Sequence, residues 1–321
     1  MEPFLAGAPR LPVTPIGLGL AAVGRPAYLT PGRDADLGED RSVEALEAVT
    51  HAVLDAAYAR GVRYLDAARS YGRAEAFLAT WLADRAPDDV TVASKWGYRY
   101  TGGWRLDAPV HEVKDHGVDA LRRQLAETRA LLGDALDVYQ IHSATLDTGV
   151  LADTAVLAEL AALAADGVTV GLTTSGPRQA DAVRQGLAAE VDGVKPFGLV
   201  QATWNLLEPS AAPALAEAAE AGWVVVVKEV LANGRLATAE AGPLAEVAAR
   251  HDTTPDAVAT AATLAEPWGA VALSGAVTPS QLASNAAAVD VRLDRDDLAA
   301  LAALAEEPQA YWQARSARPW T

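Results

Sequence analysis

The chain has 321 residues, of which 51% are hydrophobic, and a formal net charge of −16 at pH 7. This acidic balance argues against a nucleic acid or an anionic membrane as the partner, because both bind through positively charged surfaces. The sequence has no cysteine, which excludes disulfide bonds, thiolate metal ligands and a cysteine nucleophile. We also find no signal peptide and no apolar run long enough to span a membrane, so we expect a cytoplasmic protein.

Short apolar segments alternate with Ala-rich amphipathic segments along the chain. The apolar segments are typical of buried strands and cover residues 16–20, 62–67, 90–95, 136–142, 168–174, 199–204, 223–229 and 270–275. The amphipathic segments predict helices over about 42–61, 73–86, 116–132, 153–166, 177–189, 210–221, 255–266, 278–288 and 294–306.

Strands that are apolar on both faces and alternate with helices predict a parallel sheet, and eight such units predict closure into a (β/α)8 barrel. An open doubly wound sheet is the alternative, but GLGLAAVG at 17–24 is a poor match to its Gly-rich turn. Because no linker or break in composition interrupts the pattern, we expect a single domain over residues 1–321.

Two long segments, 25–41 and 96–115, follow the first and third strands. In a barrel both would lie at the carboxyl ends of the strands, where the βα loops form active sites. We expect Trp96 and Trp104 of the second segment to line a substrate pocket. The aromatic tail at 309–321 either folds over the barrel mouth, covers the outer surface of the barrel or contacts another subunit.

Polar residues stand at the ends of three consecutive strands. Asp66, Lys95 and His142 end the second, third and fourth strands, and Tyr71 follows Asp66 in the next loop. Taken singly, each has an ordinary structural reading, such as a turn cap, a solvated strand end or a packed aromatic ring. Together, a buried lysine would lower the phenol pKa, an aspartate would keep the lysine charged, and a neutral histidine would orient a carbonyl. The set can protonate a carbonyl oxygen as a hydride reaches its carbon.

Three motifs carry a resemblance to a known family: DAARSYG at 66–72, SKWG at 94–97 and QIHSA at 140–144. They resemble the motifs of the aldo-keto reductase superfamily, in which an Asp, a Tyr, a Lys and a His are catalytic. The resemblance implies these roles for Asp66, Tyr71, Lys95 and His142, with Tyr71 as the general acid or base. It also implies a (β/α)8 barrel and an NADP(H) or NAD(H) cofactor bound without a Rossmann domain. The closest branch looks like the bacterial aldose dehydrogenases.

The resemblance extends to the nicotinamide site. GLTTSGP at 171–177 places Thr173 and Thr174 where the family holds the carboxamide with Ser and Asn. QATWN at 201–205 implies that Gln201 contacts the carboxamide and that Trp204 takes the place of the tyrosine that stacks on the nicotinamide ring.

Two further segments resemble those that hold the rest of the dinucleotide, KEVLANGRL at 228–236 and LSGAVTPSQLASN at 273–285. They imply pyrophosphate or adenosine contacts for Lys228, Glu229, Leu231, Gly275, Gln281 and Asn285. Lys228 has a second reading, a salt bridge to Glu229 or another acid. Val277 and Thr278 stand where many NADPH-preferring members have a basic residue, so the preference between NADPH and NADH stays open.

HEVKDH at 111–116 contains two histidines, but a metal needs a third ligand, so we expect a pocket-lining or solvated segment and no metal. The function favoured by the sequence is an oxidoreductase for a small carbonyl or alcohol substrate, acting as a monomer or a small homo-oligomer. The alternatives are a cofactor-binding regulatory or interaction protein with little turnover, and a barrel glycoside hydrolase that uses Asp66 and Glu229.

Overall fold

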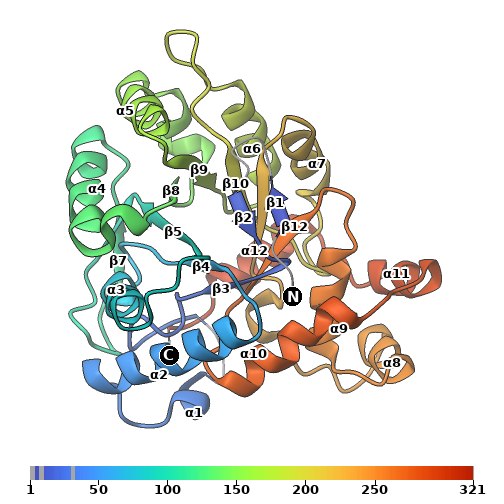
Figure 1. Ribbon diagram of the computed structural model, residues 1–321. Helices are drawn as coiled ribbons and strands as arrows, with labels where there is room; N and C mark the ends of the chain where they lie inside the picture. Colours follow the sequence, from blue (N-terminus) through green and yellow to red (C-terminus); the bar gives the residue numbers. More distant parts are fainter. Residues whose placement is uncertain (1–3, 7–10, 30–32, 321) are drawn as a thin grey trace.

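Eight parallel strands close into a barrel in the computed structural model, which describes residues 4–6, 11–29 and 33–320 (Figure 1). The strands are β3 (Ile16–Gly19), β4 (Tyr64–Asp66), β5 (Thr91–Trp96), β8 (Val138–Ile141), β9 (Thr169–Thr173), β10 (Leu199–Thr203), β11 (Val224–Lys228) and β12 (Ala270–Ser274). They pair in chain order, and β12 pairs with β3 to close the barrel. Each predicted strand is therefore confirmed, together with the (β/α)8 architecture.

The apolar character of the strands on both faces reflects two layers of packing. One layer fills the barrel interior with side chains such as Tyr64, Val138, Leu199 and Val226. The other layer lies between the strands and the surrounding helices and forms the larger part of the core. A strand between two apolar layers has no polar face, which is why the segments read as continuous apolar runs.

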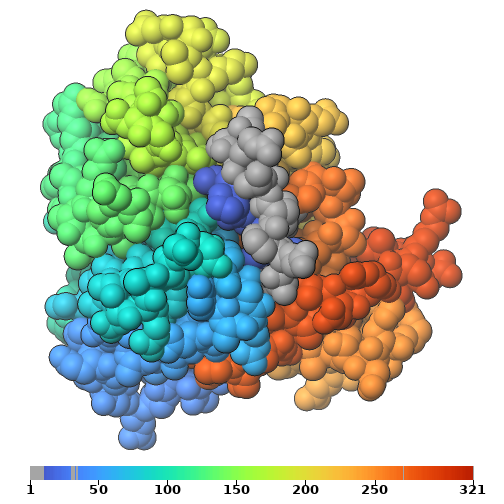
Figure 2. All heavy atoms as spheres, viewed as in Figure 1, coloured from blue at the N-terminus to red at the C-terminus, as the bar shows by residue number. Residues whose placement is uncertain are grey.

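All nine predicted helices are present. They are α2 (Val43–Ala59), α3 (Ala74–Arg85), α4 (Val118–Leu132), α5 (Thr154–Ala165), α6 (Gln179–Ala188), α7 (Ala212–Glu220), α9 (Pro255–Leu264), α10 (Pro279–Ala286) and α11 (Arg295–Ala302). Figure 2 shows that the coloured surface runs around the molecule in sequence order, from blue through green and yellow to red. The predicted cap of α2 is also present, because the Ser42 hydroxyl accepts a hydrogen bond from the Ala45 amide at 3.2 Å.

Several elements lie outside the predicted pattern. They are the antiparallel hairpin of β1 (Phe4–Ala6) and β2 (Leu11–Val13), helix α1 (Arg33–Leu37), the antiparallel hairpin of β6 (Tyr98–Tyr100) and β7 (Glu112–Lys114), α8 (Pro243–Arg250) and α12 (Pro308–Ser316). Short 3₁₀ turns occur at Gly133–Ala135, Leu146–Thr148, Val150–Ala152, Ala232–Gly234 and Ala287–Asp290.

Some of these additional elements lie in the long segments and in the tail. Segment 25–41 contains α1, and its residues 30–32 lie outside the described residues. Segment 96–115 contains the β6–β7 hairpin instead of an irregular loop. The tail contains α12. In the described part of the chain, no helix combines the length and hydropathy needed to cross a bilayer.

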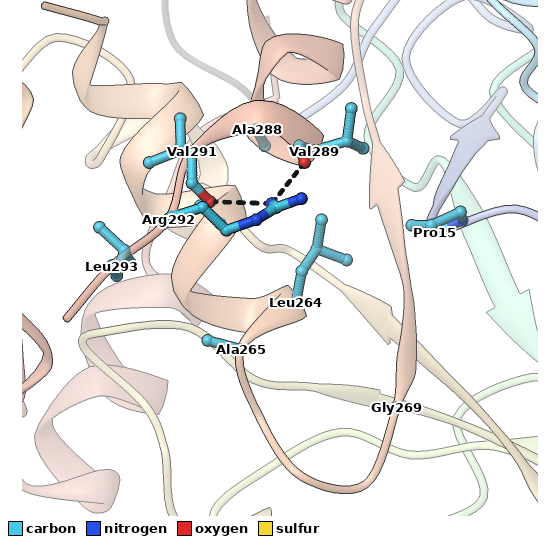
Figure 3. A pocket seen from close by; sticks show the side chains of 10 residues that line it. Pro15, Leu264, Ala265, Gly269, Ala288, Val289, Val291, Arg292 and Leu293 are labelled. Atoms are coloured by element: carbon cyan, nitrogen blue, oxygen red, sulfur yellow. Dashed lines mark hydrogen bonds between the residues drawn. The ribbon is translucent and has the colours of Figure 1, made fainter. Parts of the chain in front are cut away.

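A cavity of about 450 Å³ lies at the amino-terminal end of the barrel, next to Pro15 before β3 and Gly269 before β12. Figure 3 shows the Arg292 side chain across this cavity, donating hydrogen bonds to the Val289 and Val291 carbonyl oxygens. The ends of β4, β5 and β8, where the candidate catalytic residues lie, are at the opposite end of the barrel.

Candidate active site

The four residues expected to act together come from adjacent strands and meet at the carboxyl end of the barrel. Asp66 ends β4, Lys95 lies near the end of β5, and His142 follows β8. The Lys95 ammonium donates hydrogen bonds to Asp66 Oδ2 and, at 2.9 Å, to the Ala67 carbonyl oxygen. It also lies 4.8 Å from the centre of the Tyr71 ring. The Tyr71 hydroxyl is 3.4 Å from His142 Nε2, so the structure brings all four side chains together.

The Tyr71 phenol differs from the sequence-based expectation. Burial raises its pKa well above its usual value, and the negative charge of Asp66 raises it further. The expected lowering by Lys95 is not found, because the Lys95 charge is paired with Asp66 and lies against the face of the ring. Tyr71 is therefore a protonated phenol at neutral pH, the form that can donate a proton.

The two basic groups of the site are also shifted by burial. Burial, with a smaller contribution from the nearby Lys95 charge, holds the pKa of His142 well below its usual value. The imidazole is therefore neutral at neutral pH, as expected from the sequence. Burial lowers the pKa of Lys95 as well, but the adjacent Asp66 carboxylate opposes this shift and favours the charged ammonium.

Asp66 is held by more residues than the sequence suggested. Its Oδ1 accepts hydrogen bonds from Gln140 Nε2 at 3.3 Å and from Gln201 Nε2 at 3.0 Å, inside the barrel. Both glutamines are buried. Gln140 was not predicted from the sequence, although a glutamine inside an apolar strand indicates a buried polar partner.

The residues expected to hold the nicotinamide carboxamide have partners within the protein. The Gln201 amide bonds to Asp66, and the Thr173 hydroxyl accepts a hydrogen bond from the Ser143 amide at 2.7 Å. The Thr174 hydroxyl donates to Gln179 Oε1 at 3.5 Å. All three expected residues are buried near the ends of β9 and β10, so any contact with a carboxamide requires these bonds to be shared or exchanged.

Trp204 lies outside the group of four converging side chains, the tetrad of Asp66, Tyr71, Lys95 and His142. Its ring is buried and packs edge-on against Trp268, with 5.9 Å between the ring centres. Among the ring contacts of the described residues, Trp204 has none with Tyr71 or His142. The structure thus gives no support for its expected stacking on a nicotinamide ring, which stays a prediction.

The segment after β11 contains a chain of charges. Lys228 Nζ donates to the Thr203 hydroxyl at 2.8 Å and lies 3.7 Å from Glu229 Oε1. Glu229 in turn accepts a hydrogen bond from Arg315 Nη2 of α12 at 2.6 Å. The salt bridge left open for Lys228 is thus present. Burial lowers the pKa of Lys228 to about 8. Burial acts to raise the pKa of Glu229, but Lys228 and Arg315 outweigh it and lower this pKa to about 2.

Leu231 and Gly275 lie in the segments that follow β11 and β12. Leu231 is partly buried and packs against the core next to the turn Ala232–Gly234. Gly275 is exposed, and no atom lies within 4 Å of the position that a Cβ would occupy. The backbone at Gly275 is therefore open to close approach, and its expected contact with a dinucleotide stays a prediction.

The two amides expected at the adenosine have protein partners. The side chain of Asn285 donates to Asp256 Oδ2 and accepts from the Ser274 hydroxyl, both at 2.7 Å. Gln281 Oε1 accepts from the Val277 amide at 2.9 Å, and its Nε2 donates to Asp36 Oδ2 at 2.6 Å. Asn285 is buried, whereas Gln281 is partly exposed.

The two expected pocket tryptophans differ in exposure. Trp96 is the last residue of β5, is fully buried and packs edge-on against His116. Trp104 is partly buried, donates from Nε1 to the Arg41 carbonyl oxygen at 2.7 Å and packs edge-on against Phe77. Trp96 therefore contributes to the core, and Trp104 joins the β6–β7 segment to segment 25–41 and α3.

Residues of the HEVKDH segment contact different partners. His111 stacks on Trp320 with 4.4 Å between ring centres, and Glu112 pairs with Arg25 at 2.9 Å. His116 Nε2 donates to the His142 carbonyl oxygen at 2.9 Å. Within the described ranges, no three His, Asp or Glu side chains are grouped so that they could hold a metal ion.

The tail folds over the barrel mouth, the first of the three expected placements. Trp320 lies against Arg25, with 4.5 Å from the guanidinium carbon to the ring centre, and edge-on to Tyr28. Arg25 is buried and lies 5.3 Å from the centre of the Tyr71 ring. Arg25 was not predicted from the sequence, because it is one of several charged residues in the long segment 25–41.

A family model and several solved structures match the chain. The model of the aldo/keto reductase family matches residues 15–306. No curated protein sequence matches the chain significantly. Among solved structures, aldo-keto reductase AKR11C1 from Bacillus halodurans in its holo form has a TM-score of 0.71 and 21% identity, covering 96% of this chain and 97% of its own. Glycerol dehydrogenase AKR11B4 from Gluconobacter oxydans has a TM-score of 0.72 and 19% identity, covering 94% of each chain.

At these identities the two structures support the fold alone. The family model carries more weight, because it spans most of the chain, including all eight barrel strands and the four converging side chains. The chain therefore belongs to the aldo/keto reductase family, whose members are NAD(P)H-dependent oxidoreductases of carbonyl compounds.

Proposed function

We propose that the protein transfers a hydride between a nicotinamide cofactor and the carbonyl or alcohol carbon of a small aldehyde, ketone or sugar. The observation that carries this proposal is the convergence of Asp66, Tyr71, Lys95 and His142 at the carboxyl end of the barrel. A general acid, a cation and a neutral hydrogen-bond donor meeting at one point suit the protonation of a carbonyl oxygen.

Tyr71 acts as the general acid in reduction and as the general base in oxidation. Its phenol is protonated at neutral pH, because burial and Asp66 raise its pKa. His142 lies 3.4 Å from the phenol oxygen and stays neutral, so it can orient the substrate oxygen beside the phenol without competing as an acid. The bound cofactor supplies the hydride.

Lys95 provides the positive charge for the phenolate that forms when Tyr71 gives up its proton, and Asp66 acts indirectly by holding Lys95. The Lys95 ammonium lies 4.8 Å from the ring centre, and the buried setting weakens solvent screening of its charge. Asp66 holds Lys95 in place and favours its charged form. Gln140 and Gln201 help to hold Asp66 by donating hydrogen bonds to its second carboxylate oxygen, Oδ1.

The ends of β11 and β12 fit the phosphates of a dinucleotide. Lys228 and Arg315 provide two cations beside the end of β11, and Gly275 leaves the backbone open at the end of the neighbouring strand β12. Phosphate groups favour cationic partners and close backbone approach. Glu229 bridges the two cations, so we expect a bound phosphate to compete with this carboxylate for Lys228 and Arg315.

The proposed cofactor site is tested by titrating the purified protein with NADPH and NADH in parallel and following tryptophan fluorescence. We expect one dinucleotide to bind in the micromolar range or tighter, and Tyr71→Phe to bind it equally well because the phenol oxygen is not needed for binding. If neither dinucleotide binds, the proposed function fails. Tight binding with no turnover of any carbonyl substrate would favour the alternative, a cofactor-binding regulatory or interaction protein.

A further inference from the structure

Ser70 lies beside the histidine of the candidate active site. It is fully buried in the loop that follows β4 and directly precedes Tyr71. Its hydroxyl oxygen is 3.3 Å from His142 Nδ1, whereas the other ring nitrogen, Nε2, is 3.4 Å from the Tyr71 hydroxyl. The imidazole thus lies between two hydroxyl groups, one on each nitrogen.

The direction of the bond between Ser70 and His142 follows from counting donors and acceptors. Among the described residues, the Ser70 hydroxyl has no hydrogen-bond partner other than His142 Nδ1. A serine hydroxyl carries one proton, and a buried donor without an acceptor costs about 1–3 kcal/mol. If Nδ1 carried the ring proton, the serine proton would have no acceptor in this buried position. The hydroxyl therefore donates a hydrogen bond to Nδ1, Nε2–H donates to the Tyr71 oxygen, and the phenol keeps its own proton for the carbonyl oxygen of the substrate.

We propose that Ser70 is a positioning residue that fixes the tautomer of His142, so that Nε2 carries the ring proton and faces both Tyr71 and the substrate oxygen. A neutral imidazole has one N–H, so a nitrogen that accepts a hydrogen bond leaves the proton on the other one. This inference rests on the proposed function, because it assigns Nε2 as the donor that orients the carbonyl.

Both members of the pair are held from outside. Arg25 Nη1 donates to the Ser70 carbonyl oxygen at 2.9 Å and pairs with Glu112 on β7. The His142 amide donates to the Trp96 carbonyl oxygen at 2.8 Å, and His116 Nε2 donates to the His142 carbonyl oxygen at 2.9 Å. The backbone positions of Ser70 and His142 are thus fixed by separate elements.

His116 reaches this position because Gly97 lies directly beside it. A Cβ at Gly97 would come within 2.4 Å of the His116 ring, and the backbone of Gly97 has φ +108°. Glycine is the residue that adopts this conformation without strain. The arrangement keeps the imidazole of His142 facing Ser70 on one side and Tyr71 on the other.

The roles of the groups in the reduction then differ. Tyr71 gives its phenolic proton to the carbonyl oxygen while the hydride goes to the carbonyl carbon. His142 donates a hydrogen bond to the same oxygen and keeps its proton throughout. Ser70 contacts neither the substrate nor the cofactor in this scheme, and acts only through the orientation of His142.

The tautomer can be read from the ¹⁵N and ¹H resonances of the histidine rings in the full-length protein without any ligand. His142→Gln assigns the signals by removing one of the five histidines. We expect the Nε2–H form of His142 in the wild type and in Ser70→Thr, which keeps the hydroxyl, and a shift toward the Nδ1–H form in Ser70→Ala. A wild-type His142 in the Nδ1–H form, or an unchanged tautomer in Ser70→Ala, would overturn the proposal.

Turnover gives a second readout. We expect Ser70→Ala to lower kcat by about 10- to 100-fold while the Kd of the dinucleotide stays unchanged, and Ser70→Thr to recover most of the loss. The matched control is Thr91→Val, which removes a buried hydroxyl that donates to the Pro12 carbonyl oxygen at the other end of the barrel. An equal loss of kcat in this control would show a general structural effect and overturn the role of Ser70.

The two experiments separate this proposal from the proposed function. The tautomer of His142 is measured without cofactor or substrate, so it can contradict the role of Ser70 even in an active enzyme. Failure to bind any dinucleotide would instead contradict the proposed function, whatever the tautomer.

Discussion

At the residue scale, the site depends on a buried ion pair, and removal of either member would leave an unpaired charge in the barrel interior. Lys95 and Asp66 are both buried, and each is the charged partner of the other. Burial of a lone charge is costly, so each side chain makes the other tolerable in the barrel interior. The pair also provides the positive charge next to Tyr71, which links the stability of the site to its proposed chemistry.

Lys95→Met is therefore expected to affect both stability and turnover. It leaves Asp66 without its cation, and we expect the free energy of unfolding to fall by about 3–5 kcal/mol. Turnover should fall because the phenolate of Tyr71 loses its stabilising charge. Denaturant unfolding and steady-state rates of carbonyl reduction measure the two effects.

The matched control is Lys195→Met, which removes a lysine from an exposed position. We expect it to change the free energy of unfolding by less than about 0.5 kcal/mol. The double variant Asp66→Asn/Lys95→Met should recover part of the stability, since no unpaired charge remains, but none of the turnover. Equal stability of the wild type and Lys95→Met would contradict the role given to the pair.

The sequence predicted the members of the tetrad but not how their surroundings shift their pKa values. Strand ends and motif order were enough to bring Asp66, Tyr71, Lys95 and His142 together. The direction of the Tyr71 pKa shift was wrong, because it depends on burial and on how closely Lys95 is paired with Asp66. Hydrogen bonds such as that of Gln140 depend on distances across the barrel, which no local pattern contains.

At the element scale, the barrel was predictable because its strands and helices follow strong periodic patterns. Each strand is an apolar run buried on both faces, and each helix presents an apolar stripe to the barrel. The β6–β7 hairpin was missed because its strands have three residues each and partly exposed side chains. Helix α12 was missed because its contacts, rather than its pattern, hold it on the barrel.

Arg315→Met tests how α12 is held. Arg315 donates to Glu229, and the ring of Trp312 on α12 lies 5.9 Å from Lys228. Removal of the guanidinium should weaken the docking of α12 by about 1–3 kcal/mol. We expect faster proteolytic cleavage of the tail and a change in tryptophan fluorescence, with the barrel still folded.

Arg184→Met serves as the control for this change. Arg184 pairs with Glu217 at 2.7 Å on the surface, where ion pairs contribute about 0–1 kcal/mol. Tail cleavage should proceed at the wild-type rate in this variant. Equal cleavage rates in Arg315→Met and the wild type would show that α12 is held by its apolar contacts instead.

At the scale of the whole molecule, the stability should depend on acid through Glu229. Its pKa is lowered from 4.5 to about 2 by Lys228 and Arg315, against the effect of burial. A carboxyl group with a lowered pKa contributes stability above pH 4.5 and loses it as the pH falls toward 2. We expect this loss to reach up to about 3 kcal/mol in the free energy of unfolding.

Glu229→Gln checks the assignment. The variant should be less stable than the wild type at pH 7, and its free energy of unfolding should fall less steeply between pH 4.5 and 2. If the free energy of unfolding falls equally steeply with pH in both proteins, the acid sensitivity belongs to other carboxyl groups. Denaturant unfolding over this pH range measures both profiles.

Local sequence patterns are enough to predict some properties of the whole molecule but not others. The architecture followed from the order of the elements. The single-domain organisation and the oligomeric state stay predictions. Whether the cofactor is NADPH or NADH also stays open, because Val277 and Thr278 lack the basic side chain that would indicate the 2′-phosphate.

The most direct test of the central claim is the rate of dinucleotide-dependent reduction of a panel of small aldehydes, ketones and sugars by the wild type and Tyr71→Phe, each saturated with the dinucleotide that it binds. We predict turnover by the wild type and a loss of kcat of about 10²- to 10⁴-fold in Tyr71→Phe, with an unchanged Kd for the dinucleotide. Equal rates in the two proteins would contradict the assignment of Tyr71 as the general acid.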